Sequence, residues 1–251
     1  MSENIKKITK AFKVDLDSRE NQNILKPSAH PFNNQAYQVN EVVEKIAEKI
    51  YKLIKDAKYP NDDIILNHNK IKEAFFSPFK PQLKSAQVFL SHSHADKNKA
   101  LKVKNYLESK TNHRVFIDSL FWDYKDDVLN ELEKYDNTSK IKDAFTLILR
   151  ESLQDVIEKC PYFVFLQSKN SVSNQGLSHN QDLLKITYSA WIYEELKIAN
   201  TFITDTTLKE SHIKAMCVSY DVTNLLRRFK PISLDSLCKK IAFNLIAKDT
   251  K

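Results

Sequence analysis

Short apolar runs alternate with amphipathic segments along the C-terminal two thirds of the chain. The apolar runs are typical of strands in a parallel sheet, whose two faces are both covered, and the amphipathic segments are typical of surface helices. The predicted strands are 87–91, 114–118, 162–166 and 214–219. The predicted helices are 96–109, a helix through 149–157, one that begins at 189, and 236–247. Strands that alternate with helices indicate an α/β fold with a parallel sheet.

The N-terminal part of the chain follows another pattern. Residues 1–36 contain two prolines and a cluster of Asn residues, so we expect them to be irregular. An amphipathic helix follows, with Glu and Lys opposite one apolar stripe. The stripe consists of Val39, Val42, Val43, Ile46, Ile50, Leu53 and Ile54.

A second helix is predicted at 62–76, and the prolines of the segment that follows it mark a linker. The linker separates the helical pattern of the N-terminal part from the alternating strand and helix pattern of the C-terminal part. We therefore expect an N-terminal irregular segment and helical extension over residues 1–84, and an α/β domain over residues 85–251.

The single glycine of the chain, Gly176, excludes two kinds of nucleotide site. A Walker A loop and a GxGxxG fingerprint both need several glycines at fixed spacing. A nucleotide must therefore be held without a glycine-rich loop. Asn, Asp and Ser tolerate turn geometry better than most residues and would take that role.

Composition and charge restrict the setting of the protein. Hydrophobic residues make up 42% of the 251, which is enough for a packed core, and no apolar run approaches the roughly 20 residues that span a bilayer. The N-terminus has no apolar region of a signal peptide, and three unevenly spaced cysteines fit a reducing compartment, so we expect a cytoplasmic protein. The net charge of +7 is spread along the chain, which indicates a solvated surface rather than a nucleic-acid site.

The segment that follows the first predicted strand of the α/β part has two interpretations. Its sequence, Ser91-His92-Ser93-His94-Ala95-Asp96, contains the His-x-His-x-Asp spacing with which metallo-β-lactamase-type hydrolases begin. The residue after the aspartate is Lys97 where that motif has another histidine, and one glycine does not suit its β-sandwich. The alternative is a polar strand-to-helix corner in a doubly wound sheet, which the α/β pattern favours.

Four segments in order resemble the Toll/interleukin-1 receptor (TIR) domain family over about residues 86–220. The matching positions are Phe89-Leu90-Ser91-His92 with Asp96, Phe116 with Asp118, Ser168, and Ser189, Trp191 and Glu195. The resemblance implies a flavodoxin-like doubly wound parallel sheet. The segment 119–127 departs from the family because it lacks Pro-Gly and has Phe121, Trp122 and Tyr124 instead. These aromatic residues suit a loop anchor, an adenine platform or a self-assembly surface alike.

Enzymes of the TIR family cleave NAD⁺ between nicotinamide and ribose, and the resemblance implies the same chemistry here. The positions Trp191 and Glu195 share a helical face at i, i+4 spacing, whereas Glu194 points about a quarter-turn away, so Glu195 is the expected catalytic carboxylate. The expected substrate-binding residues are Ser91, His92, Ser93, Asp118 and Trp191. NAD⁺ would be the substrate, with no cofactor and no metal.

The resemblance also implies partners. Bacterial stand-alone TIR proteins, such as those of Thoeris anti-phage defence, make a cyclic or modified ADP-ribose that activates a separate effector. Catalytic TIR domains assemble head to tail, and the expected self-association surface here is the loop 119–127. No membrane partner is expected.

Other interpretations of these residues stay open. The Trp191–Glu195 pair is also typical of a core tryptophan beside a surface carboxylate, Asp118 of a strand-end turn, and Asp96 of a helix N-cap. The rival functions are a non-enzymatic TIR scaffold, a base-exchange enzyme that uses an acceptor other than water, and a metal-dependent hydrolase through His92, His94 and Asp96.

Overall fold

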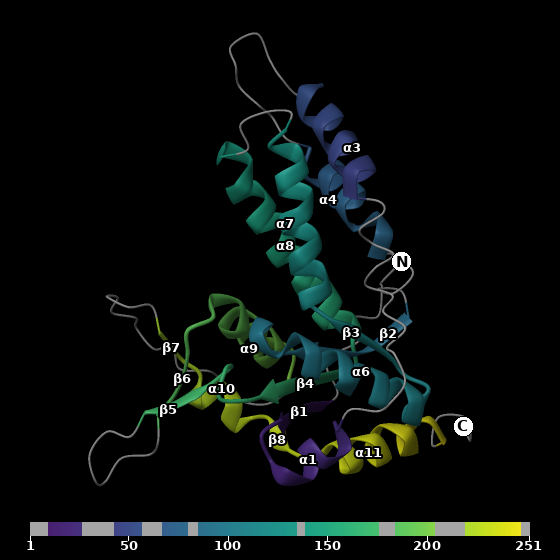
Figure 1. The fold of residues 1–251 in the computed structure, drawn as a ribbon, viewed down its shortest axis with the longest axis vertical. Helices are drawn as coiled ribbons and strands as arrows, with labels where there is room; N and C mark the ends of the chain where they lie inside the picture. Colours follow the sequence, from purple (N-terminus) through teal and green to yellow (C-terminus); the bar gives the residue numbers. More distant parts are fainter. Residues whose placement is uncertain are drawn as a thin grey trace. The chain divides into compact units, whose positions relative to one another are not determined.

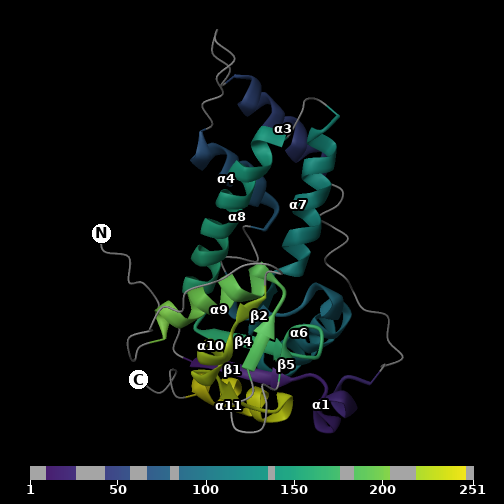
Figure 2. The same ribbon diagram turned by 90° about the vertical axis from the view of Figure 1, so that its left-hand side faces the viewer.

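The chain divides into two compact units, each built from separate stretches of sequence (Figure 1 and Figure 2). The first unit comprises residues 1–27, 86–117 and 154–251, and the second comprises residues 28–85 and 118–153. The computed structural model describes residues 10–26, 43–56, 67–79, 85–134, 139–175, 184–203 and 219–246, of which 120–124, 139–144, 175 and 243–246 are described by their backbone alone.

A five-stranded sheet in which all strands run parallel forms the centre of the first unit. Its strands are β1 (Lys10–Asp15), β2 (Ala86–Ser91), β3 (Arg114–Ile117), β4 (Tyr162–Gln167) and β8 (Lys230–Pro231). Their order across the sheet is β3-β2-β4-β1-β8. The central strand, β4, is buried from Tyr162 to Leu166, as expected for a parallel strand that is covered on both faces.

Helices flank this sheet. The helical elements of the first unit are α1 (Arg19–Ile24), η2 (His94–Asp96), α6 (Lys97–Thr111), α9 (Ala190–Phe202), α10 (Thr223–Arg227), α11 (Leu234–Ile246) and the last turns of α8 (Ser139–Lys159). Helices α6 and α11 pack against each other, and α9 packs against α10. The predicted α/β class is thus confirmed as a central all-parallel sheet flanked by helices, an arrangement consistent with a flavodoxin-like fold.

The direction of winding reverses between β2 and β4. From β2 the chain passes through α6 to β3 on one side of β2, and the next strand of the sheet, β4, lies on the other side. Ligands of open α/β sheets bind beyond the carboxyl ends of the strands at such a reversal. The fold therefore directs attention to the residues that follow β2 and β4.

A small antiparallel sheet also belongs to the first unit. Its strands, in the order β5-β6-β7, are β5 (Ser173–Gln175), β6 (Leu184–Thr187) and β7 (Tyr220–Asp221). The polar sequence of residues 168–187 is typical of a loop, but in the structure β5 and β6 form within this segment and pair antiparallel with each other. The predicted strand 214–219 lies, except for Ser219, outside the described residues.

Four helices make up the described part of the second unit. They are α3 (Val43–Lys55), α4 (His68–Phe76) with the short η1 (Ser77–Phe79), α7 (Ser119–Leu132) and the first turns of α8. Helix α3 packs against α4 and α7. It buries Val43, Ile46, Ala47, Ile50 and Ile54, so the predicted apolar stripe is confirmed except at Leu53, which is half-buried, and at Val39 and Val42, which lie outside the described residues.

The N-terminal segment corrects the prediction of an irregular start. Residues 10–15 form β1, which lies inside the sheet between β4 and β8, and residues 19–24 form α1. Consequently residues 1–27 belong to the α/β unit, and the two units do not follow the single boundary expected at residues 84 and 85. The physical reason is long-range pairing, because a strand this short is stabilised by its two neighbours rather than by its own sequence.

The segment 119–127 is also corrected, because it forms the beginning of helix α7 and not a loop. The helix contains no proline or glycine to interrupt it. Its last turns bury Val128, Leu129 and Leu132, which share one side of the helix.

Candidate functional site

Three neighbouring strands of the parallel sheet end in polar segments at the same edge. Strand β2 leads into residues 91–96, β4 into 168–171, and β1 into 15–18. Strands β1 and β2 end at different positions along β4. Along β4, the last partner of β2 is Phe165, whereas β1 continues two residues further to Gln167. The polar segment after β1 is thereby brought alongside the polar segment after β4.

The corner after β2 buries most of its polar side chains. Ser91 is fully buried and His92 is 3% exposed, whereas Ser93 is half-buried and His94 is exposed. The Ser91 hydroxyl has no hydrogen-bond partner within the described part of the chain. Buried hydroxyls in native proteins nearly always have a partner, from the chain, water or a ligand. The geometry therefore makes Ser91 a candidate contact for a bound molecule.

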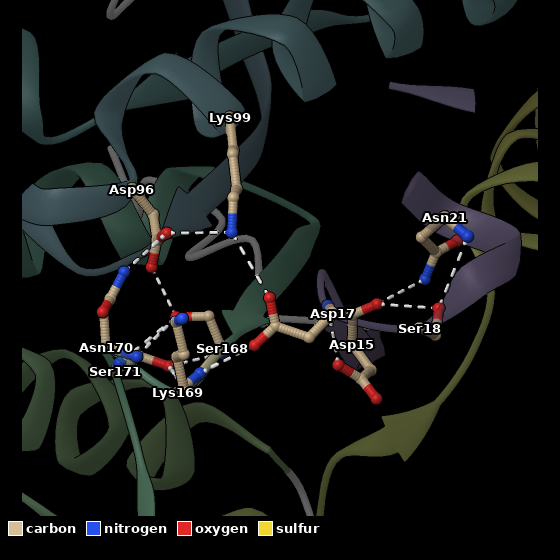
Figure 3. Close-up of polar contacts among 10 residues, drawn as sticks. All are labelled: Asp15, Asp17, Ser18, Asn21, Asp96, Lys99, Ser168, Lys169, Asn170 and Ser171. Carbon is tan, nitrogen blue, oxygen red and sulfur yellow. Dashed lines mark hydrogen bonds and ion pairs between the residues drawn. The ribbon is translucent and has the colours of Figure 1, made fainter. Parts of the chain in front are cut away.

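Asp96 connects this corner to the segment after β4 (Figure 3). It is 2% exposed, and its carboxylate accepts hydrogen bonds from the Ser168 hydroxyl and from Asn170 Nδ2, the latter at 3.0 Å. The Lys99 ammonium lies 3.4 Å from Asp96 Oδ1. Asp96 stands at the N-cap position of α6, but its side chain makes no capping hydrogen bond. Asp96 therefore occupies the predicted N-cap position, but its carboxylate contacts Ser168, Asn170 and Lys99 and does not cap the helix backbone.

Ser168 fixes the backbone of the segment that follows it. Its hydroxyl donates to Asp96 and accepts from the backbone N–H groups of Asn170, at 3.0 Å, and Ser171, at 3.3 Å. The Ser171 hydroxyl in turn accepts from the Ser168 N–H at 2.8 Å. Both serines are buried. The hydrogen bond from the Ser168 hydroxyl to the Asp96 carboxylate therefore connects the turn after β4 to the rest of the site.

Asp17 joins the segment after β1 to the same cluster (Figure 3). Its carboxylate accepts from the Lys169 N–H at 2.9 Å and lies 3.3 Å from the Lys99 ammonium. Burial alone would raise the pKa of Asp17, but these two partners outweigh it and hold that pKa below its usual value. Burial alone would lower the pKa of Lys99, and its contacts with Asp17 and Asp96 raise it instead. Lys99 thus stays protonated and bridges both carboxylates.

Asn21 holds the N-terminal segment in place. It is 2% exposed, its Nδ2 donates to the Asp15 carbonyl at 2.7 Å, and its Oδ1 accepts from the Leu234 N–H at 2.9 Å. The side chain therefore ties the end of β1 to the beginning of α11.

Glu195 lies on α9, in the same unit. Ser189 caps this helix by accepting from the Ile192 N–H at 3.2 Å. Glu195 is fully buried, while Trp191, one turn earlier, and the neighbouring Glu194 are half-buried. Burial of a carboxylate disfavours its charged form unless other groups compensate. Figure 1 shows α9 near the end of the sheet towards which the arrow of β4 points.

The predicted site residues fall into three groups. Ser91, His92 and Ser93 form one corner after β2, and Trp191 and Glu195 share α9. Asp118 directly follows β3 and occupies the N-cap position of α7, without a capping side-chain bond, as the first residue of the second unit. The first two groups therefore belong to one compact unit, and Asp118 belongs to the other.

A metal centre at His92, His94 and Asp96 has no support from the described residues. Across these ranges, no three His, Cys, Asp or Glu side chains gather as metal ligands. His94 is exposed, and the Asp96 carboxylate already accepts from two side chains.

Asp17, Lys99 and Asn170 were not predicted from the sequence as site residues. One signal would have found Asn170, because polar residues directly after an apolar strand lie at the edge where ligands bind. Asp17 had no such signal, because β1 itself was not predicted. Its role follows only from the pairing of β1 with β4.

Comparisons with known proteins identify no relative: no family model, no curated protein and no solved structure matches this chain. No helix within the described ranges is long and apolar enough to cross a bilayer.

Proposed function

We propose that the protein is a TIR-type enzyme that cleaves NAD⁺ between nicotinamide and ribose, with Glu195 as its catalytic carboxylate. The proposal starts from the resemblance of the four sequence segments to the TIR family. The structure supports it at a coarser level, through a parallel α/β sheet whose winding reverses between β2 and β4. The polar corner Ser91–Ser93 lies at that reversal.

The complete burial of Glu195 is the observation that carries the proposal. The other buried residues of α9 are Ile192, Leu196, Ile198, Ala199 and Asn200, so Glu195 is the one carboxylate among them. Lys, Glu, Arg and Asp are seldom fully buried, since water stabilises the charged form. A buried carboxylate at this position is more readily explained by chemistry than by folding stability.

The reaction needs little from the protein beyond electrostatic stabilisation and positioning. When the C–N bond between ribose and nicotinamide breaks, its electron pair stays on the ring nitrogen and nicotinamide leaves as a neutral molecule. The ribose becomes an oxocarbenium-like cation, and the Glu195 carboxylate stabilises that charge and orients the ribose hydroxyls. Water then attacks the cation and releases a proton, which gives ADP-ribose. Attack by another atom of the same molecule gives a cyclic product instead.

The biological role proposed here follows from the same resemblance. A cyclic or modified ADP-ribose would serve as a signal in bacterial anti-phage defence and would act on a separate effector protein. Base exchange, in which an acceptor other than water attacks the ribose, would use the same site.

The test is to incubate purified protein with NAD⁺ and to measure nicotinamide and the nucleotide products by chromatography with mass detection. Glu195→Gln keeps the shape of the side chain and removes its charge, so we expect a loss of cleavage of at least about 100-fold, which is the scale of one electrostatic group in an active site. Glu194→Gln is the matched control, because it makes the same change one residue away on the half-buried side of α9.

Equal activity of the wild-type protein and Glu195→Gln would show that Glu195 is not the catalytic carboxylate. A wild-type protein that releases no nicotinamide from NAD⁺, even at high protein concentration, would contradict the enzymatic proposal. The mass of the product separates hydrolysis, cyclisation and base exchange.

A non-enzymatic scaffold is the second candidate. It is favoured by the cluster of Asp96, Ser168 and Asn170, because polar groups at the winding reversal bind one another there. In that case, the wild-type protein would be silent with NAD⁺ and would form concentration-dependent oligomers, measured by light scattering during gel filtration.

A further inference from the structure

We propose that Asp96 is a positioning residue of the site: by tying the turn after β4 to the corner after β2, it holds Ser91 and His92 where the substrate binds. The inference rests on the proposed function and extends it to residues that do not touch the substrate. The N-terminal segment takes part through Asp17.

The hydrogen bonds of the cluster have a fixed direction. The Ser168 hydroxyl gives its proton to Asp96 Oδ2, while its oxygen accepts from the N–H groups of Asn170 and Ser171. Both acceptor positions of that oxygen are therefore used. Asp96 Oδ1 accepts from Asn170 Nδ2 and faces the Lys99 ammonium. Ser168, Asn170 and Lys99 thus all present donors to the Asp96 side chain, which suits the two oxygens of a carboxylate.

The same residue controls the corner that precedes it. Between Ser91 and Asp96 lie only four residues, and the Asp96 N–H donates to the Ser93 carbonyl at 2.8 Å, which closes the turn. A carboxylate anchored at Ser168 and Asn170 therefore fixes one end of the corner, and β2 fixes the other end. Movement of Asp96 would release Ser93 first and then the buried Ser91 and His92.

A second connection supports the turn after β4 from the other side. The Asp17 carboxylate accepts from the Lys169 N–H and pairs with Lys99, which also faces Asp96. The side chains of Asp17 and Lys99 are 35% and 40% exposed, so water weakens this connection. We therefore expect Asp96 to act as the main positioning residue and Asp17 as the minor one.

Asp96→Asn tests the inference with almost no change in shape. If the new amide NH₂ faces Ser168, it meets a hydroxyl whose acceptor positions are used, and if it faces Asn170, it meets another NH₂ and Lys99. Either orientation loses a buried hydrogen bond. Ser168→Ala breaks the same connection from the other side, and Asp17→Asn breaks the exposed one. The control is Asp155→Asn on α8, which makes the same substitution outside the cluster.

The first measurement is backbone hydrogen exchange of the protein without NAD⁺. For Asp96→Asn and Ser168→Ala we expect the amides of residues 168–172 to exchange about tenfold faster or more, which corresponds to the loss of one buried hydrogen bond. Residues 91–96 should also exchange faster. For Asp17→Asn the increase should be confined to Lys169. In the Asp155→Asn control, residues 91–96 and 168–172 should exchange as in the wild-type protein.

The second measurement is the NAD⁺ cleavage rate against substrate concentration. A positioning role predicts that Asp96→Asn raises KM about tenfold while kcat changes less, because the variant disturbs substrate contacts and leaves Glu195 intact. Unchanged exchange in Asp96→Asn would overturn the inference whatever the activity. Faster exchange with unchanged KM and kcat would overturn it too, because the cluster would then be structural only. A wild-type protein that releases no nicotinamide would overturn the proposed function, and with it the positioning role.

Discussion

The two strands on either side of β4, β2 and β1, differ in how strongly their own sequences predict a buried strand. Strand β2 has the sequence AQVFLS, and its apolar run predicts a buried strand without further information. Strand β1 has the sequence KAFKVD, in which Lys13 interrupts the short apolar run and a charged residue stands at each end. In the structure both pair in parallel with β4, and Ala11 of β1 and Phe89 of β2 have the same partner, Phe163.

The comparison shows that equal burial does not require equal sequence signals. Phe12 and Val14 of β1 are as inaccessible to water as Phe89 and Leu90 of β2. Lys13 remains half-buried, and burial, followed by the charge of Lys185, lowers the pKa of Lys13. A half-buried lysine is therefore tolerated within the sheet, because Phe12 and Val14 on either side of it are buried in the core.

The strongest test of this comparison replaces one buried phenylalanine in each strand. Phe12 is 1% exposed, and Phe89 is fully buried with its ring stacked on that of Phe163 at 5.4 Å. We expect Phe12→Ala and Phe89→Ala each to lower the free energy of unfolding by about 3–5 kcal/mol, since both leave a cavity in the core. Urea unfolding followed by circular dichroism measures both values.

A much smaller loss of stability for Phe12→Ala than for Phe89→Ala would show that the two strands do not contribute equally to the core. If Phe12→Ala lowered the free energy of unfolding by less than about 1 kcal/mol, the value typical of a surface substitution, β1 would be an appendage and not an internal strand.

A smaller effect is expected at Asn21, which anchors the end of β1. Asn21→Ala removes the donor to the Asp15 carbonyl and the acceptor for the Leu234 N–H, and so leaves two backbone groups without that partner. We expect a loss of about 1–3 kcal/mol in thermal or urea unfolding. Asn224→Ala is the control, because this Asn is exposed and should change stability by less than about 0.5 kcal/mol. Equal effects of the two substitutions would show that Asn21 does not anchor β1.

The smallest effect concerns Asp17 and depends on pH. Because the pKa of the Asp17 carboxyl is lowered in the folded protein, its contribution to stability is present above its usual pKa of about 3.9 and is lost as the pH falls through the lowered value. We expect Asp17→Asn to be less stable than the wild-type protein at pH 7 by at most about 1 kcal/mol, since solvent screens the pair.

Thermal unfolding of the wild-type protein and Asp17→Asn from pH 7 down to pH 2 measures this difference. The two curves should converge at the acidic end. A difference that persists when the carboxyl is protonated would assign the effect to packing rather than to charge.

The sequence predicted the elements whose own residues carry a strong periodic signal. The apolar stripe of α3, the continuous apolar run of β4, and the helix expected to begin at 189, which is α9, were all predicted close to their observed positions. The position of Glu195 on α9 follows from the same helical spacing. Its complete burial did not follow, because the spacing describes which residues share a face and not what covers that face.

Segments with weak local signals were mispredicted. Residues 119–127 contain polar and aromatic residues without a clear stripe and were taken for a loop, but they begin α7. Residues 173–175 and 184–187 are too short and polar to be predicted as strands, and they are stabilised by antiparallel pairing with each other. Asp96 does lie at the predicted N-cap position of α6, but its carboxylate accepts hydrogen bonds from Ser168 and Asn170, which are far along the chain, and not from the helix backbone.

Local sequence patterns were enough to predict the α/β class, the strands β2, β3 and β4, and the polar character of the corner 91–96. These features depend on residues close together in the chain, so local periodicity and composition are enough to specify them. The tertiary structure alone decided that residues 10–15 lie inside the sheet, and that Asp17, Asp96 and Ser168 meet at its edge. Such contacts join residues more than 70 positions apart, and their stability comes from pairing and burial that only the folded chain provides.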